Sequence, residues 1–164
     1  METFHTIAEV SATFLGFAGV IVALRFTRTG QQPVSKYTDP FILGILVTSM
    51  FAILFAFLPD LLFKGLPQTE FEWRVANGLF GLWHASATIP MFTWRRSIKE
   101  PATLRMSLIS QPVVGLKLLV AGGLFIEFAY QIYLLGLLWL LMVSIFYFFR
   151  SIMKMTDGGN SADA

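Results

Sequence analysis

Cysteine is absent from this sequence, histidine occurs twice, and charged residues make up only 13% of the chain. The lack of cysteine excludes disulfide bonds, thiolate nucleophiles and cysteine-ligated metals. Two histidines are too few for a haem or a redox centre with several metals. The chain also lacks H-E-x-x-H, G-x-S-x-G, P-loop and dinucleotide-binding motifs. We therefore expect no enzymatic activity, no cofactor and no metal site.

The scarcity of charge is matched by an excess of apolar residues. Hydrophobic residues make up 55% of the 164 positions, and phenylalanine alone occurs 17 times. A soluble domain of this length could not cover so much apolar surface with so few charges. A helix needs about 20 apolar residues to cross about 30 Å of hydrocarbon, so there is room for four or five spans. We expect an all-α integral membrane protein with one polytopic helical domain over residues 1–155.

The first apolar segment runs from about Ile7 to Leu24. Thr6 and Glu9 have the spacing of a capping box, which predicts that the helix begins at Thr6. No basic segment precedes this run and no A-x-A cleavage site follows it. We therefore expect it to remain as a span rather than to be removed as a signal peptide.

The second apolar segment has a clear start. Asp39 followed by Pro40 is typical of a helix N-cap and first helical position. The predicted span extends to about Leu58, where Pro59 kinks or ends the helix.

The third span is predicted from Trp73 to Trp94, behind a second capping box formed by Thr69 and Glu72. Its two tryptophans would lie about 31 Å apart along a helix. That distance matches the spacing of the two interfacial aromatic belts of a bilayer.

The region from Met106 to Arg150 is too long for one span. We expect two helices, Met106 to Ile126 and Tyr130 to Phe149, joined by a tight turn around Glu127 that contains no Gly or Pro. The alternative is a four-span protein, in which this region forms one long helix or a re-entrant segment before a single last span.

The distribution of basic residues favours five spans. With five spans, one side of the membrane collects almost all of the Lys and Arg residues, and the other side holds only Lys64 and Arg74. The positive-inside rule then places the N-terminus outside and the C-terminus in the cytoplasm. The basic side should favour anionic lipid head groups. No aromatic residues alternate with these charges, so nucleic-acid binding is not indicated. Residues 156–164 are small and polar, and we expect a disordered cytoplasmic tail.

Three ionisable residues interrupt the apolar segments: Glu9, His84 and Lys117. An ionisable group inside a membrane costs several kcal/mol unless it is paired or hydrated, and so indicates a functional site. His84 and Lys117 fall at similar depth, near the middle of their spans. Either Lys117 snorkels or pairs with Glu9 to fix helix packing, or it lines a water-filled path or ligand cavity.

Polar and small residues share one helix face with His84, among them Asn77 before it and Thr88 after it. Such a face should contact protein or water rather than lipid. A neutral His84 bonded to a backbone carbonyl or to Thr88 would be structural, and a proton relay or a metal ligand would be functional. On the outer side, Asp60 and Glu127 could form an acidic rim that concentrates cations, although the positive-inside rule alone also leaves acids there.

A row of small residues on the first span, Ala8, Ala12 and Gly16, allows close helix approach, and Gly19 continues a neighbouring row. These rows serve either packing within the chain or a seam between copies of it. The segment from Ile7 to Gly19 also resembles small bacterial membrane proteins. We expect the bacterial inner (plasma) membrane.

Two functions are consistent with this pattern. The first is a non-enzymatic, self-associating membrane protein whose polar residues line a cavity or path for protons or small ions. The second is an accessory or assembly subunit of a larger membrane complex, in which the buried polar residues are purely structural.

Overall fold

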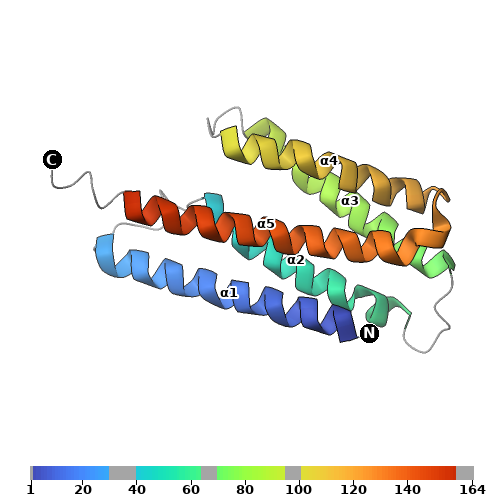
Figure 1. Cartoon of the computed structure of the whole chain (residues 1–164), viewed down its shortest axis with the longest axis horizontal. Coiled ribbons are helices and arrows are strands. Elements are labelled where there is room, and N and C mark those ends of the chain that lie inside the picture. Colours follow the sequence, from blue (N-terminus) through green and yellow to red (C-terminus); the bar gives the residue numbers. More distant parts are fainter. Residues whose placement is uncertain (1, 30–39, 64–69, 95–100, 158–164) are drawn as a thin grey trace. The chain divides into compact units, whose positions relative to one another are not determined.

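The computed structural model describes residues 2–29, 40–63, 70–94 and 101–157. Within these ranges the chain is helical and contains no strand, as predicted. The elements are α1 (Glu2–Thr29), α2 (Pro40–Leu62), α3 (Glu70–Trp94), α4 (Pro101–Ala121), the short 3₁₀ helix η2 (Ile126–Phe128) and α5 (Ala129–Asp157). The expected number of five long helices is therefore confirmed for the described part of the chain (Figure 1).

Among the described residues, three segments are long and apolar enough to cross a membrane: Glu2–Leu24, Phe41–Leu62 and Ile126–Met153. The apolar part of α4, Leu108–Ala121, is shorter. The membrane character inferred from composition thus has a structural counterpart in α1, α2 and α5. That α3 and α4 also cross the membrane stays a prediction.

The chain divides into two compact units. The first unit contains α1, α2 up to Ala56, and α5 from Leu140 onward. The second unit contains the end of α2, α3, α4, η2 and α5 up to Trp139. Within the second unit, α3 and α4 lie side by side and run in opposite directions (Figure 1).

Helix α1 begins earlier than the sequence predicts. The Thr6 hydroxyl donates a hydrogen bond of 3.0 Å to the carbonyl of Glu2, one turn back within the helix. Thr6 is therefore not an N-cap, and the capping box with Glu9 is wrong. A Thr inside a helix bonds back to the preceding turn in this way. The helix already begins at Glu2, four residues before Thr6.

Helix α2 begins at Pro40, as predicted, but it does not end at Pro59. The ring of Pro59 is fully buried, and the chain remains helical to Leu62. The Phe63 amide donates to the Pro59 carbonyl at 3.0 Å. A proline can be accommodated here because it removes one amide donor while the following turn still closes.

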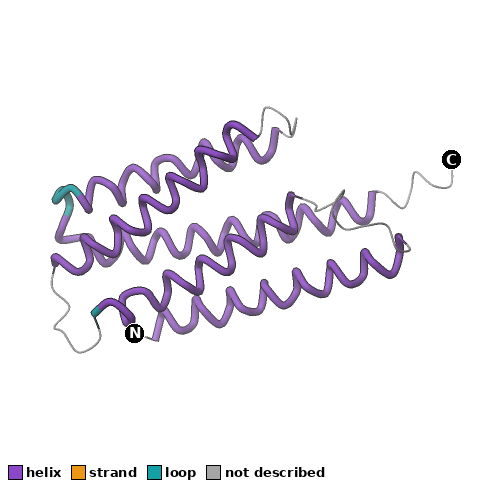
Figure 2. The backbone as a smooth tube through the Cα atoms, turned by 180° about the vertical axis from the view of Figure 1, so that it is seen from behind, coloured by secondary structure: helices purple, strands orange, loops and turns teal. Residues whose placement is uncertain are grey.

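The connection between α4 and α5 differs most from the prediction. Two helices are present, as expected, but the turn lies at residues 122–125 and contains Gly122 and Gly123 (teal in Figure 2). Gly123 has φ of 99° and Phe125 has φ of 55°. The amide of Leu124 donates to the Leu119 carbonyl at 3.0 Å, closing the end of α4. Glu127 lies in η2, within this connection, as predicted, but α4 ends at Ala121 rather than at Ile126 and the turn does contain glycine. Both glycines are also compatible with an apolar helix, so the sequence does not mark the turn.

The first unit is held by small polar and aromatic side chains. Thr48 of α2 and Ser144 of α5 share a hydrogen bond of 2.7 Å, and Ser49 donates to Ser144 at 3.3 Å. Phe14 of α1 packs edge-on against Phe148 of α5, with ring centroids 5.8 Å apart. These contacts join α1, α2 and α5 into one packed group.

Several predicted features lie outside the described residues. These are the caps Asp39 and Thr69, the loop cations at positions 36, 64, 95, 96 and 99, and the tail from residue 158. Helix α5 itself continues to Asp157.

Candidate functional site

The second unit buries a lysine completely. Lys117 of α4 has 0% of its surface exposed. Its Nζ lies 3.4 Å from Nδ1 of His84 on α3, and 3.1 Å from the centroid of the Phe80 ring. His84 is itself only 6% exposed. The amine therefore does not snorkel to the surface. The other two interpretations from the sequence, pairing with Glu9 and lining a path or cavity, stay predictions.

Two glycines leave space for this lysine. A Cβ atom built on Gly136 of α5 would collide with Cε and Nζ of Lys117. A Cβ on Gly81 of α3 would lie 3.3 Å from Cβ of Lys117 and 3.0 Å from the Leu118 side chain. The lysine thus occupies the volume that a side chain at position 136 would need, with α3 close on the other side.

Aromatic rings surround the same region. The Phe80 ring stacks on the His84 ring at 6.3 Å and meets the Tyr133 ring edge-on at 5.4 Å. Tyr133, also fully buried, packs against Trp73 at 5.6 Å. These rings supply a low-dielectric wall and, at Phe80, a π face toward the amine.

The contacts of the amine set its electrostatics. Within the part of the chain that the structure describes, Lys117 meets His84 and Phe80, and neither carries a negative charge. Removing an ammonium from water costs several kcal/mol, and a cation–π contact recovers about 2 kcal/mol when it is desolvated. The contacts of the amine in the described chain are thus a neutral base and an aromatic ring.

The geometry also constrains the histidine. A protonated amine has only donors, so the Lys117 ammonium can bond His84 only if Nδ1 is the unprotonated nitrogen. The ring proton is then on Nε2. Two nitrogen bases lie within hydrogen-bond range of each other at this point, and we call them the Lys117–His84 pair.

Asn77 lies on the same helix face, two turns before His84, and is fully buried. Its Nδ2 donates to the carbonyl of Trp73 at 2.9 Å and to that of Ala129 at 2.8 Å. Its Oδ1 has no hydrogen-bond partner. Asn77 thus ties α3 to the first residue of α5 and leaves one acceptor unsatisfied.

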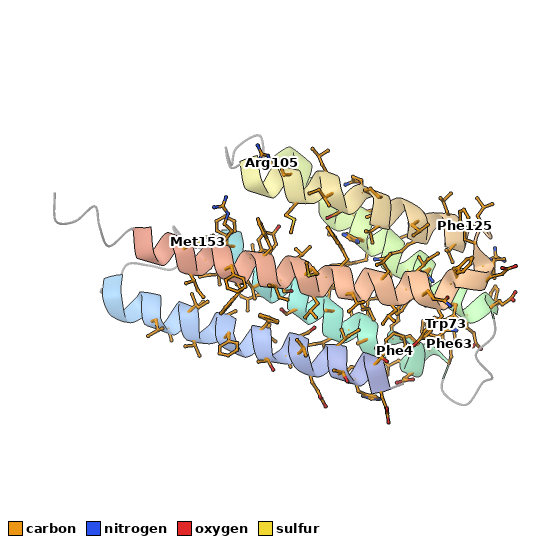
Figure 3. The ribbon with its side chains drawn as sticks, in the orientation of Figure 1. Phe4, Phe63, Trp73, Arg105, Phe125 and Met153 are labelled. Carbon is orange, nitrogen blue, oxygen red and sulfur yellow. The ribbon has the colours of Figure 1, made fainter. Side chains whose placement is uncertain are left out.

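At the opposite end of the unit, α4 and α5 are joined by a complete hydrogen-bond chain. The Trp139 indole donates to Ser110 Oγ at 3.1 Å, and Ser110 donates to the Met106 carbonyl at 2.7 Å. Figure 3 shows that Arg105 lies at this end of α4, whereas Trp73 and Phe125 lie at the end near η2.

The remaining predicted residues have diverse positions. Glu9 belongs to the first unit and is exposed. Its pairing with Lys117 stays a prediction because the two residues belong to different units. Asp60 is half-buried near the end of α2, and Glu127 is exposed in η2. The side chain of Thr88 lies outside the described residues.

The predicted helix-packing residues do not share one environment. Ala8 is buried, whereas Ala12, Gly16 and Gly19 are exposed. No atom lies within 4 Å of a Cβ built on Gly16 or Gly19. The row therefore turns from the core of the first unit to its surface.

Sequence reasoning missed several residues of the site. Phe80 and Gly136 contact Lys117 and Tyr133 packs against Phe80, but all three look like ordinary members of apolar runs. Glu72, predicted only as part of a capping box, is buried at 7% exposure. The one available signal was Gly136, a glycine in the middle of an apolar helix, which often marks a close approach.

Among the described residues, no group of three or more His, Asp or Glu side chains is placed to hold a metal ion. No protein-family model, curated protein or solved structure matches this chain. Function must therefore be argued from its own residues.

Proposed function

We propose that this chain is a non-enzymatic membrane protein that takes up, transfers and releases protons at the Lys117–His84 pair. A single observation carries the proposal: a fully buried amine lies 3.4 Å from an imidazole nitrogen, with no carboxylate among its contacts in the described chain. Structural lysines in membrane helices usually reach an interface or an acidic partner. This one reaches a second base.

The contacts favour protons over metal cations. A protonated lysine repels cations, and the space around the amine is filled by Phe80 and by the close approach of α5 at Gly136. Cation sites in proteins are lined by oxygen ligands, whereas the amine meets an imidazole and a benzene ring. Of the two kinds of permeant expected from the sequence, the proton fits better.

A proton can pass through the Lys117–His84 pair by transfer and then release. The ammonium of Lys117 donates to Nδ1 of His84, and transfer of that proton leaves a neutral amine and an imidazolium. The imidazolium then releases the proton on Nε2 and becomes the other neutral tautomer. The ring then returns to its first tautomer, with its proton on Nε2, and the neutral amine takes up one proton, which restores the ammonium. One proton enters and one leaves in each cycle.

Proteoliposomes with an internal pH dye and an imposed potential provide the test. Lys117→Met should abolish proton uptake, because methionine keeps the volume but has no base. Leu118→Met, at the exposed neighbouring position, is the matched control and should behave like the unmodified protein. Equal uptake by all three proteins would exclude the pair as a proton carrier. Glu9→Leu in the same assay decides whether Glu9 takes part.

A second function is favoured by a different observation, the exposed small residues of α1. Ala12, Gly16 and Gly19 leave a face without bulky side chains, which suits a second helix at short distance. That face would serve self-association or docking into a larger complex. The mass of the purified protein in nanodiscs separates the two, since a discrete oligomer indicates self-association and a monomer indicates an accessory role.

A further inference from the structure

We propose that a water molecule bridges Arg74 Nε and Asn77 Oδ1 in the second unit, and that this water connects the Lys117–His84 pair with the end of the unit at η2. The connection between this water and the pair rests on the proposed function. The water site itself does not.

The Asn77 amide has a fixed orientation. Both of its N–H groups donate to carbonyl oxygens, at 2.9 and 2.8 Å. Turning the amide over would place its own oxygen against two carbonyl oxygens. Oδ1 is therefore an acceptor that needs a donor, in a side chain with 0% exposure.

An unsatisfied donor lies on the same helix face. Arg74 Nε is buried and has no hydrogen-bond partner, while Nη2 of the same guanidinium donates to the Ala121 carbonyl at 3.3 Å. Residues three apart on a helix are neighbours, with Cβ atoms about 5–6 Å apart. One orphan donor and one orphan acceptor at this spacing match what a single water needs, because it can accept from Nε–H and donate to Oδ1.

The energetics favour occupancy. Leaving a buried polar atom unsatisfied costs about 1–3 kcal/mol, and Arg74 and Asn77, three residues apart on α3, carry one such atom each. Buried waters typically make about three hydrogen bonds to otherwise unsatisfied polar groups. The remaining hydrogen of a bridging water is then free to reach a further acceptor deeper in the unit.

The position of the site gives the proposed route its direction. Asn77 is seven residues, or about 10 Å along the helix, from His84, and its partner Ala129 directly follows η2. Tyr133 contacts Trp73 and Phe80, which flank Asn77 on α3, so this stretch reaches the level of the lysine. Toward the other end, the Ser110 hydroxyl both accepts from Trp139 and donates to Met106.

The two ends of the second unit thus differ in their unsatisfied buried polar atoms. Its described buried side-chain atoms that lack a partner are Arg74 Nε and Asn77 Oδ1, both on the η2 side of the pair. We infer that protons reach the pair from that side. In the five-span topology expected from the sequence, it is the outer side.

Infrared difference spectroscopy of the full chain in nanodiscs tests the water site. Acid-minus-base spectra are recorded in H₂¹⁶O and H₂¹⁸O, and a bound water gives an O–H stretching band that shifts with the isotope. We expect this band in the unmodified protein and in Ser110→Ala, and its loss in both Asn77→Leu and Arg74→Met. Persistence of the band in the two latter variants would overturn the water site, and the use of two variants guards against one that fails to fold.

The route is tested separately, by the rate at which the Lys117 amine exchanges hydrogen with solvent in ¹⁵N-lysine-labelled protein, with the signal assigned by its loss in Lys117→Met. Removal of one bridging hydrogen bond should slow exchange by about tenfold in Asn77→Leu and leave it unchanged in Ser110→Ala. Slower exchange in Ser110→Ala instead would place the route at the opposite end and contradict the inference. Normal exchange without proton uptake by liposomes would refute the proposed function alone.

Discussion

Gly136 of α5 lies against the end of the Lys117 side chain, which fills the space that a side chain at position 136 would need. A methyl group at position 136 would meet Cε and Nζ of the lysine. The absence of a side chain on α5 is therefore part of what positions the amine against His84 and Phe80. This relationship yields a direct prediction.

Gly136→Ala should destabilise the protein by about 1–3 kcal/mol, because overpacking a filled interior forces neighbouring atoms to move. Thermal unfolding in detergent or nanodiscs measures the effect. The matched background is Lys117→Ala, in which the Cβ at position 136 would meet only the Phe80 ring, at 3.0 Å, among the contacts named for it. There the same substitution should cost clearly less, and an equal cost in both backgrounds would show that the lysine does not occupy the site.

Lys117→Met should separate stability from function. Lys117→Met removes a buried amine with no carboxylate among its contacts in the described chain, and with it the cost of taking an ammonium out of water. We therefore expect an unchanged or higher unfolding temperature together with loss of proton uptake. A lower unfolding temperature would mean that the amine stabilises the fold and would favour a structural role for the pair.

The turn between α4 and α5 offers a second stability test. Gly123 has φ of 99°, and a Cβ there would lie 3.2 Å from Nη2 of Arg74. Gly123→Ala should cost about 1–3 kcal/mol from backbone strain, with a further loss if Arg74 is pushed from Ala121. Gly122→Ala is the control, since its φ is not positive and its nearest contact is 3.4 Å. The two variants should therefore differ clearly in thermal unfolding.

Composition and apolar runs were sufficient to predict five helices, because hydropathy over about 20 residues is a strong signal. The helix ends were predicted less well. The Thr6–Glu9 spacing looks like a cap, yet tertiary packing extends α1 backward and buries Phe4. The Gly122–Gly123 turn was hidden because both residues are also tolerated in apolar helices.

The site, too, was predictable only in part. Depth along the spans placed His84 and Lys117 at one level, since depth depends only on counting residues. Their contact depends on which faces of α3 and α4 meet, and on Gly136 from a third helix. Neither follows from the periodicity of a single helix, so Phe80, Tyr133 and Gly136 could not be assigned to the site beforehand.

The exposed small residues of α1 give the last prediction. Gly16→Ile and Gly19→Ile add bulk where no atom lies within 4 Å of the Cβ position, so neither should disturb folding of the monomer. If α1 forms a seam between copies, the added side chains should hold the helices apart and shift the nanodisc-embedded protein from oligomer to monomer. Gly44→Ile is the opposite control, because a Cβ at position 44 would lie 2.5 Å from the Tyr147 ring and should damage folding itself. An oligomer that persists in both α1 variants would show that this face does not mediate self-association, and its small residues would then remain available for a different partner.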